Sequence, residues 1–525
     1  MSSRGRAAVQ GSVAGFIAAL VMVIAVVVLR LVLGVPLLVE LASDRIIPTL
    51  SIKQFGKLAA KLGGLTRGKE VALISSFVLQ VGLATIAGTL AGIILGGRHD
   101  RRGVTSKVLA SVLLAIAGGS IALLWPVLSS NYRGLPPGPA TVTNVLAILV
   151  SFALYGVAFW ATLDSLDRAP RSRGDELRKS EPSRPMFGRR AFLAAGGGAL
   201  LAVLSGGLVN LLYRRATVGP NGYDGLLVRG PRTDPITPND RFYVVTKNLI
   251  DPAIDRDVWR LEVSGLVEHP RTLAFAELTS MPSRSQVQTL ECISNGVGGG
   301  LMSNASWRGV PLATLLHSAR PRPDGRFVLM HASDGYIHVV SLARAMAPST
   351  LVAYEMNGRP LPHRHGFPAR VLVPGTYGEV NVKWVDRIQV LDRPVEGYYE
   401  RQGWRPWFVN TTSRFDHPAN GQALSLSGGS PIQLNGVAYA GDRGISRVEV
   451  SADEGATWQE AGIDYAPGKL AWALWSALWS PPAPGTYTLK VRATDGTGAV
   501  QTEETRGRAP SGAAGRHQVR VMVRA

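Results

Sequence analysis

Cysteine is almost absent from this sequence, and histidine is nearly missing from its first half. Cys292 is the only cysteine among 525 residues, so no disulfide can form within the chain. His99 is the only histidine before His269, which excludes paired histidine ligands for a haem among the N-terminal apolar runs. Those runs also lack acidic residues at their centres, which argues against a proton-coupled transporter. We expect no haem.

Long uncharged runs are present in the N-terminal part of the chain. They cover roughly residues 11–29, 71–97, 108–128, 141–162 and 191–213. Each approaches or exceeds the ~20 apolar residues with which a helix crosses a bilayer. The sequence therefore predicts a four-span all-α transmembrane region over residues 1–165, and a fifth span within residues 166–215.

Positive charge is concentrated in this apolar part. Residues 1–215 carry 24 Lys and Arg against 9 Asp and Glu, whereas residues 216–525 carry 32 against 28. The positive excess therefore indicates membrane topology rather than nucleic-acid binding. We expect the lipid bilayer as a partner and no nucleic acid. Because loops rich in Lys and Arg stay in the cytoplasm, the segments 98–102 and 168–190 should face the cytoplasm.

Five spans that begin inside place everything after Tyr213 outside, so we expect a multi-pass protein of the cell membrane with its soluble half extracytoplasmic. The loop 45–69 does not fit this scheme, because it holds six Lys and Arg residues and yet lies outside. Its spacing suits an amphipathic helix in the membrane interface.

A pair of arginines precedes the fifth span. Arg189 and Arg190 are followed by Phe192, Leu193 and a stretch of small residues, which resembles a twin-arginine export signal. The alternative is an ordinary membrane anchor oriented by its basic linker. No small-x-small cleavage site follows, so we expect the helix to remain as an anchor.

From about Tyr223 the chain consists of short β-like runs separated by Pro and Gly. The expected strands are 242–246, 259–265, 327–333, 369–375 and 386–392. Brief helices are expected at 275–281 and 311–319. No Gly-x-Gly-x-x-Gly follows a strand, which excludes a dinucleotide fold. The sequence predicts an α+β domain over residues 216–395.

The last part of the chain shows strand patterns alone. Alternating runs at 445–462, 485–496 and 516–525 are separated by turn residues. Several short strands at this spacing are typical of a β-sandwich. The sequence predicts an all-β immunoglobulin-like domain over residues 396–525.

The single cysteine has two interpretations. Cys is more often a small buried hydrophobe than a functional group. However, Cys292 precedes the glycine-rich segment "SNGVGGG", in which glycines let the backbone approach another group closely. A thiolate at such a place suits a soft metal ion. The residues alone leave both interpretations open.

Two stretches identify a family resemblance. They are "LECISNGVGGG" with "NASWRGVPLATLL" (290–316), and "AYEMNGRPLPHRHGFPARVLVPGTYGEVNVKWVDRIQV" (353–390). Over about residues 235–525 the chain resembles the sulfite oxidase family of mononuclear molybdenum enzymes. The resemblance implies a molybdenum–molybdopterin cofactor, with Cys292 as the catalytic metal ligand and the pterin dithiolene and oxo groups as the others.

The resemblance also implies which residues contact the pterin. His365 and Arg370 match residues that hold its phosphate end, a role suited to an imidazole and a guanidinium fork. The other contacts it implies are Asn248, Asp334, Asn381 and Lys383. Without the resemblance, the charged positions among these would be interpreted as solvated strand residues, and Asp334 as a turn residue.

The chain departs from the family pattern where substrate binds. Gly296 and Val297 stand where sulfite-oxidising members carry an arginine, and a second arginine expected near residues 242–248 is missing, with Lys247 close by. Trp404 takes the place of a catalytic tyrosine. These departures leave the cofactor site complete and place sulfite itself in doubt, so the substrate could be another oxyanion, a sulfoxide or an organic molecule.

The resemblance further implies partners. The all-β part resembles the family's dimerisation domain and predicts a homodimer, and electrons should pass to a separate partner protein. We expect an oxidoreductase that transfers an oxygen atom and two electrons at molybdenum to or from a small-molecule substrate. The alternatives are an inactive membrane-tethered binding or adhesion module and a membrane-embedded sensor or transporter with a soluble appendage.

Overall fold

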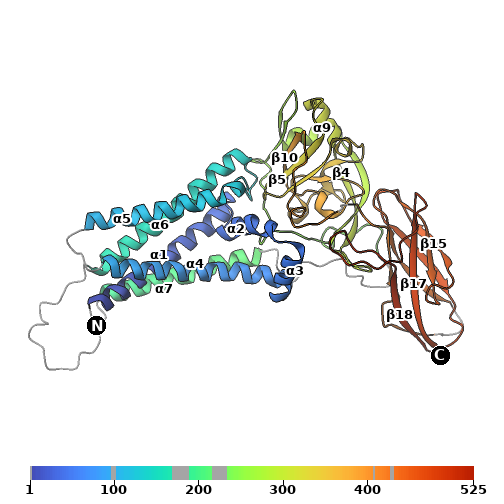
Figure 1. Cartoon of the computed structure of the whole chain (residues 1–525), viewed down its shortest axis with the longest axis horizontal. Coiled ribbons are helices and arrows are strands. Elements are labelled where there is room, and N and C mark those ends of the chain that lie inside the picture. Colours follow the sequence, from blue (N-terminus) through green and yellow to red (C-terminus); the bar gives the residue numbers. More distant parts are fainter. Residues whose placement is uncertain are drawn as a thin grey trace, which may run out of the picture.

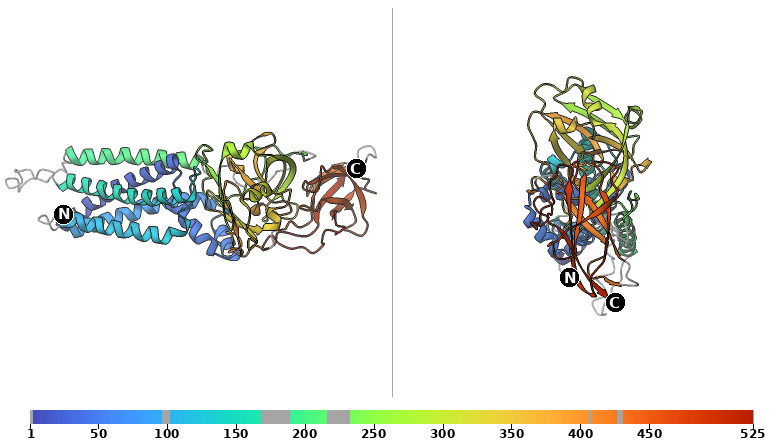
Figure 2. Two further views of the ribbon diagram at one scale, coloured as in Figure 1. Left: turned by 90° about the horizontal axis from the view of Figure 1, so that it is seen from above. Right: turned by 90° about the vertical axis from the view of Figure 1, so that its right-hand side faces the viewer.

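The computed structural model describes residues 3–95, 102–167, 189–215, 233–405, 408–425 and 431–524. A bundle of long helices, a mixed α+β domain and an all-β domain follow one another along the longest axis of the molecule (Figures 1 and 2). Most of the basic segments predicted to face the cytoplasm, residues 98–101 and 168–188, lie outside the described residues.

The bundle contains the five predicted apolar helices. These are α1 (Ser3–Leu33), α4 (Leu65–Leu95), α5 (Arg102–Leu124), α6 (Pro137–Asp167) and α7 (Arg189–Arg215). All five are long and apolar enough to cross a membrane. Large apolar side chains such as Val78, Leu114 and Val157 are about two-thirds exposed on their outer faces. Helices that are apolar all round are typical of membrane spans rather than of a soluble bundle.

Helices α1 and α4 pack closely because each carries glycines four residues apart. Gly11 and Gly15 of α1 face Gly88 and Gly92 of α4, and a Cβ at Gly88 would stand 2.5 Å from the Cα of Gly15. Small residues at this spacing let the backbones of two membrane helices approach each other. This contact holds together the two helices that the loop 34–64 connects.

That loop folds into short helices at the end of the bundle next to the α+β domain (Figure 1). They are α2 (Leu38–Ile46), a 3-10 turn (Ile47–Thr49) and α3 (Ile52–Lys61). Ser51 caps α3 by accepting a hydrogen bond from the backbone of Gln54. Helix α3 is amphipathic, with Lys53, Lys57 and Lys61 on one face. The basic loop thus forms the amphipathic helix that its spacing predicts.

The α+β domain is built on two sheets. In the first, β1 (Arg260–Gly265) pairs in parallel with β10 (Val385–Leu391), and the order is β2-β1-β10-β5-β6, with β2 (Arg271–Ala274), β5 (Phe327–Ala332) and β6 (Ile337–Ser341). The second joins β3 (Arg284–Glu291), β4 (Met302–Pro311), β7 (Leu351–Met356), β8 (Arg359–Pro360) and β9 (Arg370–Leu372). Helices α8 (Phe275–Ser280), α9 (Leu312–Ala319) and α10 (Leu342–Ala345) connect them.

One predicted strand of this domain is wrong. Residues 242–246 are extended but pair with no strand. Phe242 instead packs edge-on against Trp307, and Tyr243 stacks on Phe242. All five of these residues line a cavity beside the second sheet, and a short apolar run of this kind cannot be told from a buried strand by its pattern alone.

The C-terminal domain is all-β, as predicted. Its strands follow the order β11-β13-β16-β15-β14-β17-β18-β12 and enclose one core that includes Phe415, Trp475 and Val519. The strands are β11 (Thr412–His417), β12 (Ala423–Ser425), β13 (Ile432–Tyr439), β14 (Ile445–Ser451), β15 (Gln459–Tyr465), β16 (Ala473–Trp479), β17 (Gly485–Asp495) and β18 (His517–Arg524). The backbone N–H of Trp472 donates to the hydroxyl of Thr289 in β3, and the hydroxyl of Tyr439 donates to the carbonyl of Thr289. These bonds join the C-terminal domain to β3, the strand that Cys292 directly follows.

The bundle is docked on the α+β domain by polar contacts. The backbone N–H of Asn131 donates to Ser333 O at 2.6 Å, and Arg133 forms an ion pair with Asp255 at 2.8 Å. Arg30, which is buried and paired with Glu40 at 3.0 Å, also donates to Ile250 O. The end of the bundle that holds these residues is therefore packed against the α+β domain.

Candidate cofactor site

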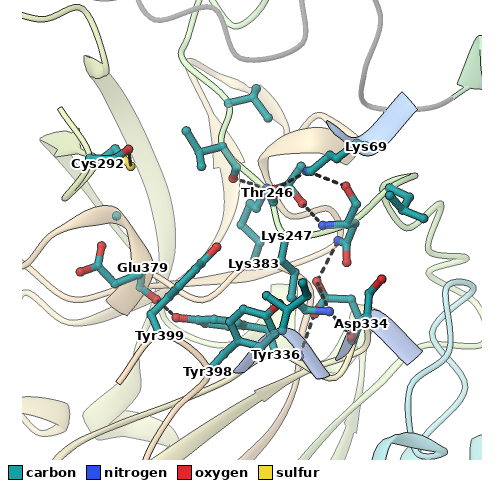
Figure 3. Close-up of a pocket in the computed structure, with 18 of the residues that line it drawn as sticks. Lys69, Thr246, Lys247, Cys292, Asp334, Tyr336, Glu379, Lys383, Tyr398 and Tyr399 are labelled. Carbon is teal, nitrogen blue, oxygen red and sulfur yellow. Dashed lines mark hydrogen bonds and ion pairs between the residues drawn. The ribbon is translucent and has the colours of Figure 1, made fainter. Parts of the chain in front are cut away.

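A cavity of about 340 Å³ lies between the α+β domain and the end of the helical bundle. Every residue predicted for the site lines it: Asn248, Cys292, Asp334, His365, Arg370, Asn381 and Lys383. They come from separate strand ends and loops of the two sheets. Figure 3 shows Cys292 on one side of the cavity and Asp334 with Lys69 on the other.

Cys292 stands directly after β3, where the strand gives way to the glycine-rich turn. Its backbone N–H donates to Leu301 O at 3.0 Å, and Asn295 N–H donates to Cys292 O at 2.8 Å. The sulfur lies 3.0 Å from the hydroxyl of Ser294. Burial, reinforced by the nearby charge of Glu379, raises the pKa of the thiol to about 11. A bound metal ion would reverse this, since a coordinating thiol is deprotonated outright.

Arg370, Lys383 and His365 lie together at one end of the cavity, called here the cationic end. Arg370 donates to the backbone carbonyls of His365 at 3.1 Å and Asn381 at 2.9 Å, while its buried Nε has no hydrogen-bond partner among the described residues. Lys383 Nζ lies 3.1 Å from Arg364 O. Burial lowers the pKa of Arg370 to about 10 and that of Lys383 to about 8. No carboxylate forms an ion pair with either cation within the described residues.

His365 completes this end in its neutral form. Burial lowers the pKa of its imidazole to about 3, and its Nε2 lies 3.0 Å from Asn239 O. Buried cations without an anion are costly. The free Nε of Arg370 and the depressed pKa of Lys383 therefore fit a ligand whose anionic end, such as a phosphate, enters between them.

This end predicts a pH dependence of cofactor binding. Lys383 loses its proton as the pH rises through about 8, and a phosphate bound beside it favours the protonated form. Binding must then take up a proton above pH 8, so the affinity of the apoprotein for the pterin cofactor should fall about tenfold per pH unit there, toward the ordinary lysine pKa. Equilibrium titration of the full chain between pH 7 and pH 10 measures this. A Lys383→Arg variant should lose the dependence, and an unchanged slope in that variant would contradict the assignment.

The opposite wall of the cavity is a network around residues 246–248. Asn248 Nδ2 donates to the carboxylate of Asp334 at 2.8 Å. Lys247 donates to Asp334 O at 2.9 Å and to the carboxylate of Asp44, from α2, at 2.7 Å. Burial lowers the pKa of Lys247, but the charges of Asp44 and Asp334 outweigh it and leave the pKa above its ordinary value. Lys247 is therefore a buried structural cation and does not take the place of the missing arginine.

The helical bundle supplies further residues that sequence reasoning missed. Lys69 of α4 donates to the carbonyls of Thr246 at 2.6 Å and Asn248 at 2.7 Å, as Figure 3 shows. The hydroxyl of Tyr132 bonds to the side chain of Asn248 at 3.4 Å. The only signal in the sequence was the basic loop 45–69, which did not fit the predicted topology. The N-terminal region, from which no contribution to the site was expected, thus shapes it.

Asn381 differs from the other predicted contacts. Its amide oxygen accepts from Val373 N at 2.8 Å, and its Nδ2 donates to Tyr377 O at 2.9 Å. The side chain therefore holds the 373–381 loop in shape, and its backbone carbonyl holds Arg370. Asn381 supports the site through the loop and through Arg370.

Aromatic and acidic residues surround Cys292 where substrate would approach. Tyr398, Tyr399 and Trp404 all line the cavity, and Figure 3 shows the hydroxyl of Tyr399 directed into it. Glu379 is half-buried on the Cys292 side, no side chain among the described residues bonds to its buried carboxylate oxygens, and burial of the carboxyl group raises its pKa to about 8. Near Gly296, the guanidinium of Arg508 from the C-terminal domain lies 3.2 Å from where a Cβ would stand. The guanidinium of Arg508 thus lies near Gly296, where sulfite-oxidising members of the family carry an arginine.

Comparison with known proteins agrees with these features. Residues 248–399 match the family model described as oxidoreductase molybdopterin binding domain, and residues 406–522 match the Mo-co oxidoreductase dimerisation domain. Mitochondrial sulfite oxidase of Rattus norvegicus is 34% identical over 294 residues, which cover 47% of this chain and 54% of the relative. NADPH nitrate reductase of Aspergillus niger is 28% identical over 341 residues, which cover 51% of this chain and 39% of the relative.

Among solved structures, the sulfane dehydrogenase SoxCD of Paracoccus pantotrophus is 27% identical, with a TM-score of 0.47 over 51% of this chain and 75% of that one. The chain spans about half the length of the curated sulfite oxidases that it matches. The two family matches lead to one assignment. Through residues 248–399 and 406–522 the chain belongs to the sulfite oxidase family of molybdopterin-dependent oxidoreductases.

Proposed function

We propose that this chain is a membrane-anchored molybdenum enzyme that transfers an oxygen atom and two electrons to or from a small substrate, a sulfite-like oxyanion or a sulfoxide. One observation carries the proposal: a single cavity joins the buried thiol of Cys292 to Arg370 and Lys383, which form no ion pair among the described residues. The bound molybdenum–pterin cofactor supplies the two-electron chemistry, and the protein supplies binding, orientation and charge.

The residues of the chain divide this work. Arg370, Lys383 and His365 hold the phosphate end, and Asn248 with Asp334 contacts the pterin ring. Cys292 holds the metal through its sulfur. The Tyr399 hydroxyl and the Glu379 carboxyl lie nearest to the space left for substrate, where each can hold a proton or donate a hydrogen bond.

Metal and pterin analysis of the purified full chain tests this function. Protein expressed with the cofactor pathway active should contain about one molybdenum and one pterin per chain, because the family binds a single mononuclear centre. The measurement is elemental analysis together with fluorescence of the oxidised pterin. Metal-free wild-type protein under these conditions would reject the enzyme and favour a binding module.

We further propose that the catalytic domain lies outside the cytoplasmic membrane, with the all-β domain as an immunoglobulin-like dimerisation module. Helices α1, α5 and α7 end on the same side of the bundle as the α+β domain (Figure 1). The opposite ends adjoin the basic segments 98–102 and 168–190, which favour the cytoplasm.

A reporter that works only in the cytoplasm, fused after Ala525, should therefore be silent.

Changing Arg189 and Arg190 to lysine keeps the charge and removes only arginine-specific export recognition. The Lys-Lys variant should strand the folded domain on the cytoplasmic side, where the reporter becomes active. A silent reporter in both proteins would leave the topology standing and reject the export signal.

A further inference from the structure

The roof of the cofactor cavity is apolar and comes from the helical bundle. Phe55, Leu58 and Ala59 of α3 and Leu62, which follows it, line the cavity together with Ile47 and Ala72. No residue of α3 is buried, and Leu58 is 41% exposed. The helix is tied to the α+β domain at its start, where Ile52 N–H donates to Gln402 O at 3.1 Å. Its apolar face therefore looks onto the cavity without being packed against a protein core.

The opposite face of α3 indicates where this roof lies relative to a bilayer. Lys53, Lys57 and Lys61 project from it, and the helix sits at the ends of the long apolar helices (Figure 1). Lysines beside the ends of membrane-spanning helices are typical anchors at the bilayer interface. In the proposed topology, the roof of the cavity thus lies at the level of the bilayer surface, where apolar molecules dissolved in the membrane can reach it.

A buried polar atom beside the roof has no partner. Gln402 is 4% exposed and lines the cavity. Its Nε2 donates to Ile47 O at 3.1 Å, whereas its Oε1 accepts no hydrogen bond within the described residues. Buried acceptors are normally satisfied. The free Oε1 fits a ligand that carries a hydroxyl donor on an otherwise apolar ring.

We propose that the roofed part of the cavity binds the ring of a lipid-soluble quinone, in its hydroquinone form through Gln402 Oε1, and that this quinone is the electron partner of the site. This inference rests on the proposed two-electron function. For a substrate X the balanced reaction is X + H2O + Q → XO + QH2. The oxygen atom of water goes to X, its two protons form the two O–H bonds of the hydroquinone, and X loses the two electrons that Q gains. The reverse reaction consumes QH2.

A phospholipid acyl chain is the other occupant that an apolar roof at this level could hold. An acyl chain has no donor for Gln402 Oε1 and carries no electrons. The pairing of an apolar roof with a free acceptor, in one cavity with the cofactor contacts, therefore favours the quinone.

Binding of a short-tailed quinone probe tests this. The cofactor-loaded full chain in lipid nanodiscs is titrated with decyl-benzoquinone and, anaerobically, with its hydroquinone. Saturable binding of both is expected. Leu58→Glu puts a charge into the roof and should weaken the binding of both probes by more than tenfold. Lys57→Glu, on the opposite face of α3, should leave the binding of both probes unchanged. Gln402→Leu should weaken the binding of the hydroquinone about three- to tenfold more than the binding of the quinone, because it removes one hydrogen bond to the hydroquinone.

Soluble electron carriers separate this inference from the proposed function. Dithionite and ferricyanide should reduce and reoxidise the cofactor in the wild type and in all three variants, because they need no roof. If they do so while the probe fails to bind, or while it binds Leu58→Glu as tightly as the wild type, the roof holds lipid and the quinone is rejected. Absence of molybdenum from the wild type would instead reject the proposed function.

Discussion

Replacing Cys292 by serine is expected to abolish turnover while the pterin stays bound. A hydroxyl is a much poorer ligand than a thiolate for a soft metal. Loss of the residues around metal ligands already costs 10- to 100-fold, so loss of the ligand itself should cost more than about a hundredfold. In the proposed arrangement the pterin should remain, because Arg370 and Lys383 line the same cavity and would hold its phosphate end.

A second variant separates the ligand from a buried hydrophobe. If Cys292 only fills space, Cys292→Ala should keep metal and activity, since a small apolar side chain replaces another. If it binds the metal, alanine and serine should both lose activity. Molybdenum content, pterin fluorescence and turnover, measured on both variants, decide between these. Full activity of Cys292→Ala would overturn the assignment.

The second large effect is expected at the junction of bundle and domain. Lys247 is 4% exposed on its side chain, and Asp44 lies 2.7 Å from its Nζ. Asp44→Asn leaves that ammonium buried with only the more distant Asp334 carboxylate, at 3.9 Å. Removing one partner of a buried ion pair costs about 3–5 kcal/mol. We therefore expect a lower melting temperature, together with loss of cofactor as residues 246–248 loosen.

An exposed ion pair provides the matched control. Asp234 pairs with Arg241 at 2.9 Å, and both side chains are more than half exposed. Such pairs contribute about 0–1 kcal/mol, so Asp234→Asn should melt with the wild type and keep its cofactor. If Asp44→Asn behaves in the same way, the ion pair between Asp44 and Lys247 contributes nothing measurable to stability or to cofactor retention.

The candidate site residues follow from the family resemblance over residues 235–525. Cys292 has a glycine-rich turn after it, and His365 and Arg370 lie five residues apart in one motif. All of them line the same cavity. The five long helices could be predicted because membrane spans have a length and composition that no other element shares.

What could not be predicted depends on contacts between distant segments. Lys69 and Asp44 precede the residues they hold by about 180 and 200 positions, and nothing local marks a lysine that will donate to two backbone carbonyls. The charges of the loop 45–69 were counted as a topology signal, although Lys69 is used inside the protein. Residues 242–246 show the converse, since this short apolar run resembles a strand and yet pairs with no strand among the described residues.

The contacts of Lys69, Asp44 and Tyr132 also bear on how the enzyme can be cut. In a protein tethered by a passive anchor, the catalytic domain can be released and studied alone. Here a cut before residue 233 would strip the carbonyls of Thr246 and Asn248 of their donor and expose Lys247 to water. The isolated domain would have an opened wall on one side of its cofactor cavity. In the proposed function, the helical bundle is therefore both the membrane anchor and one wall of the cofactor cavity.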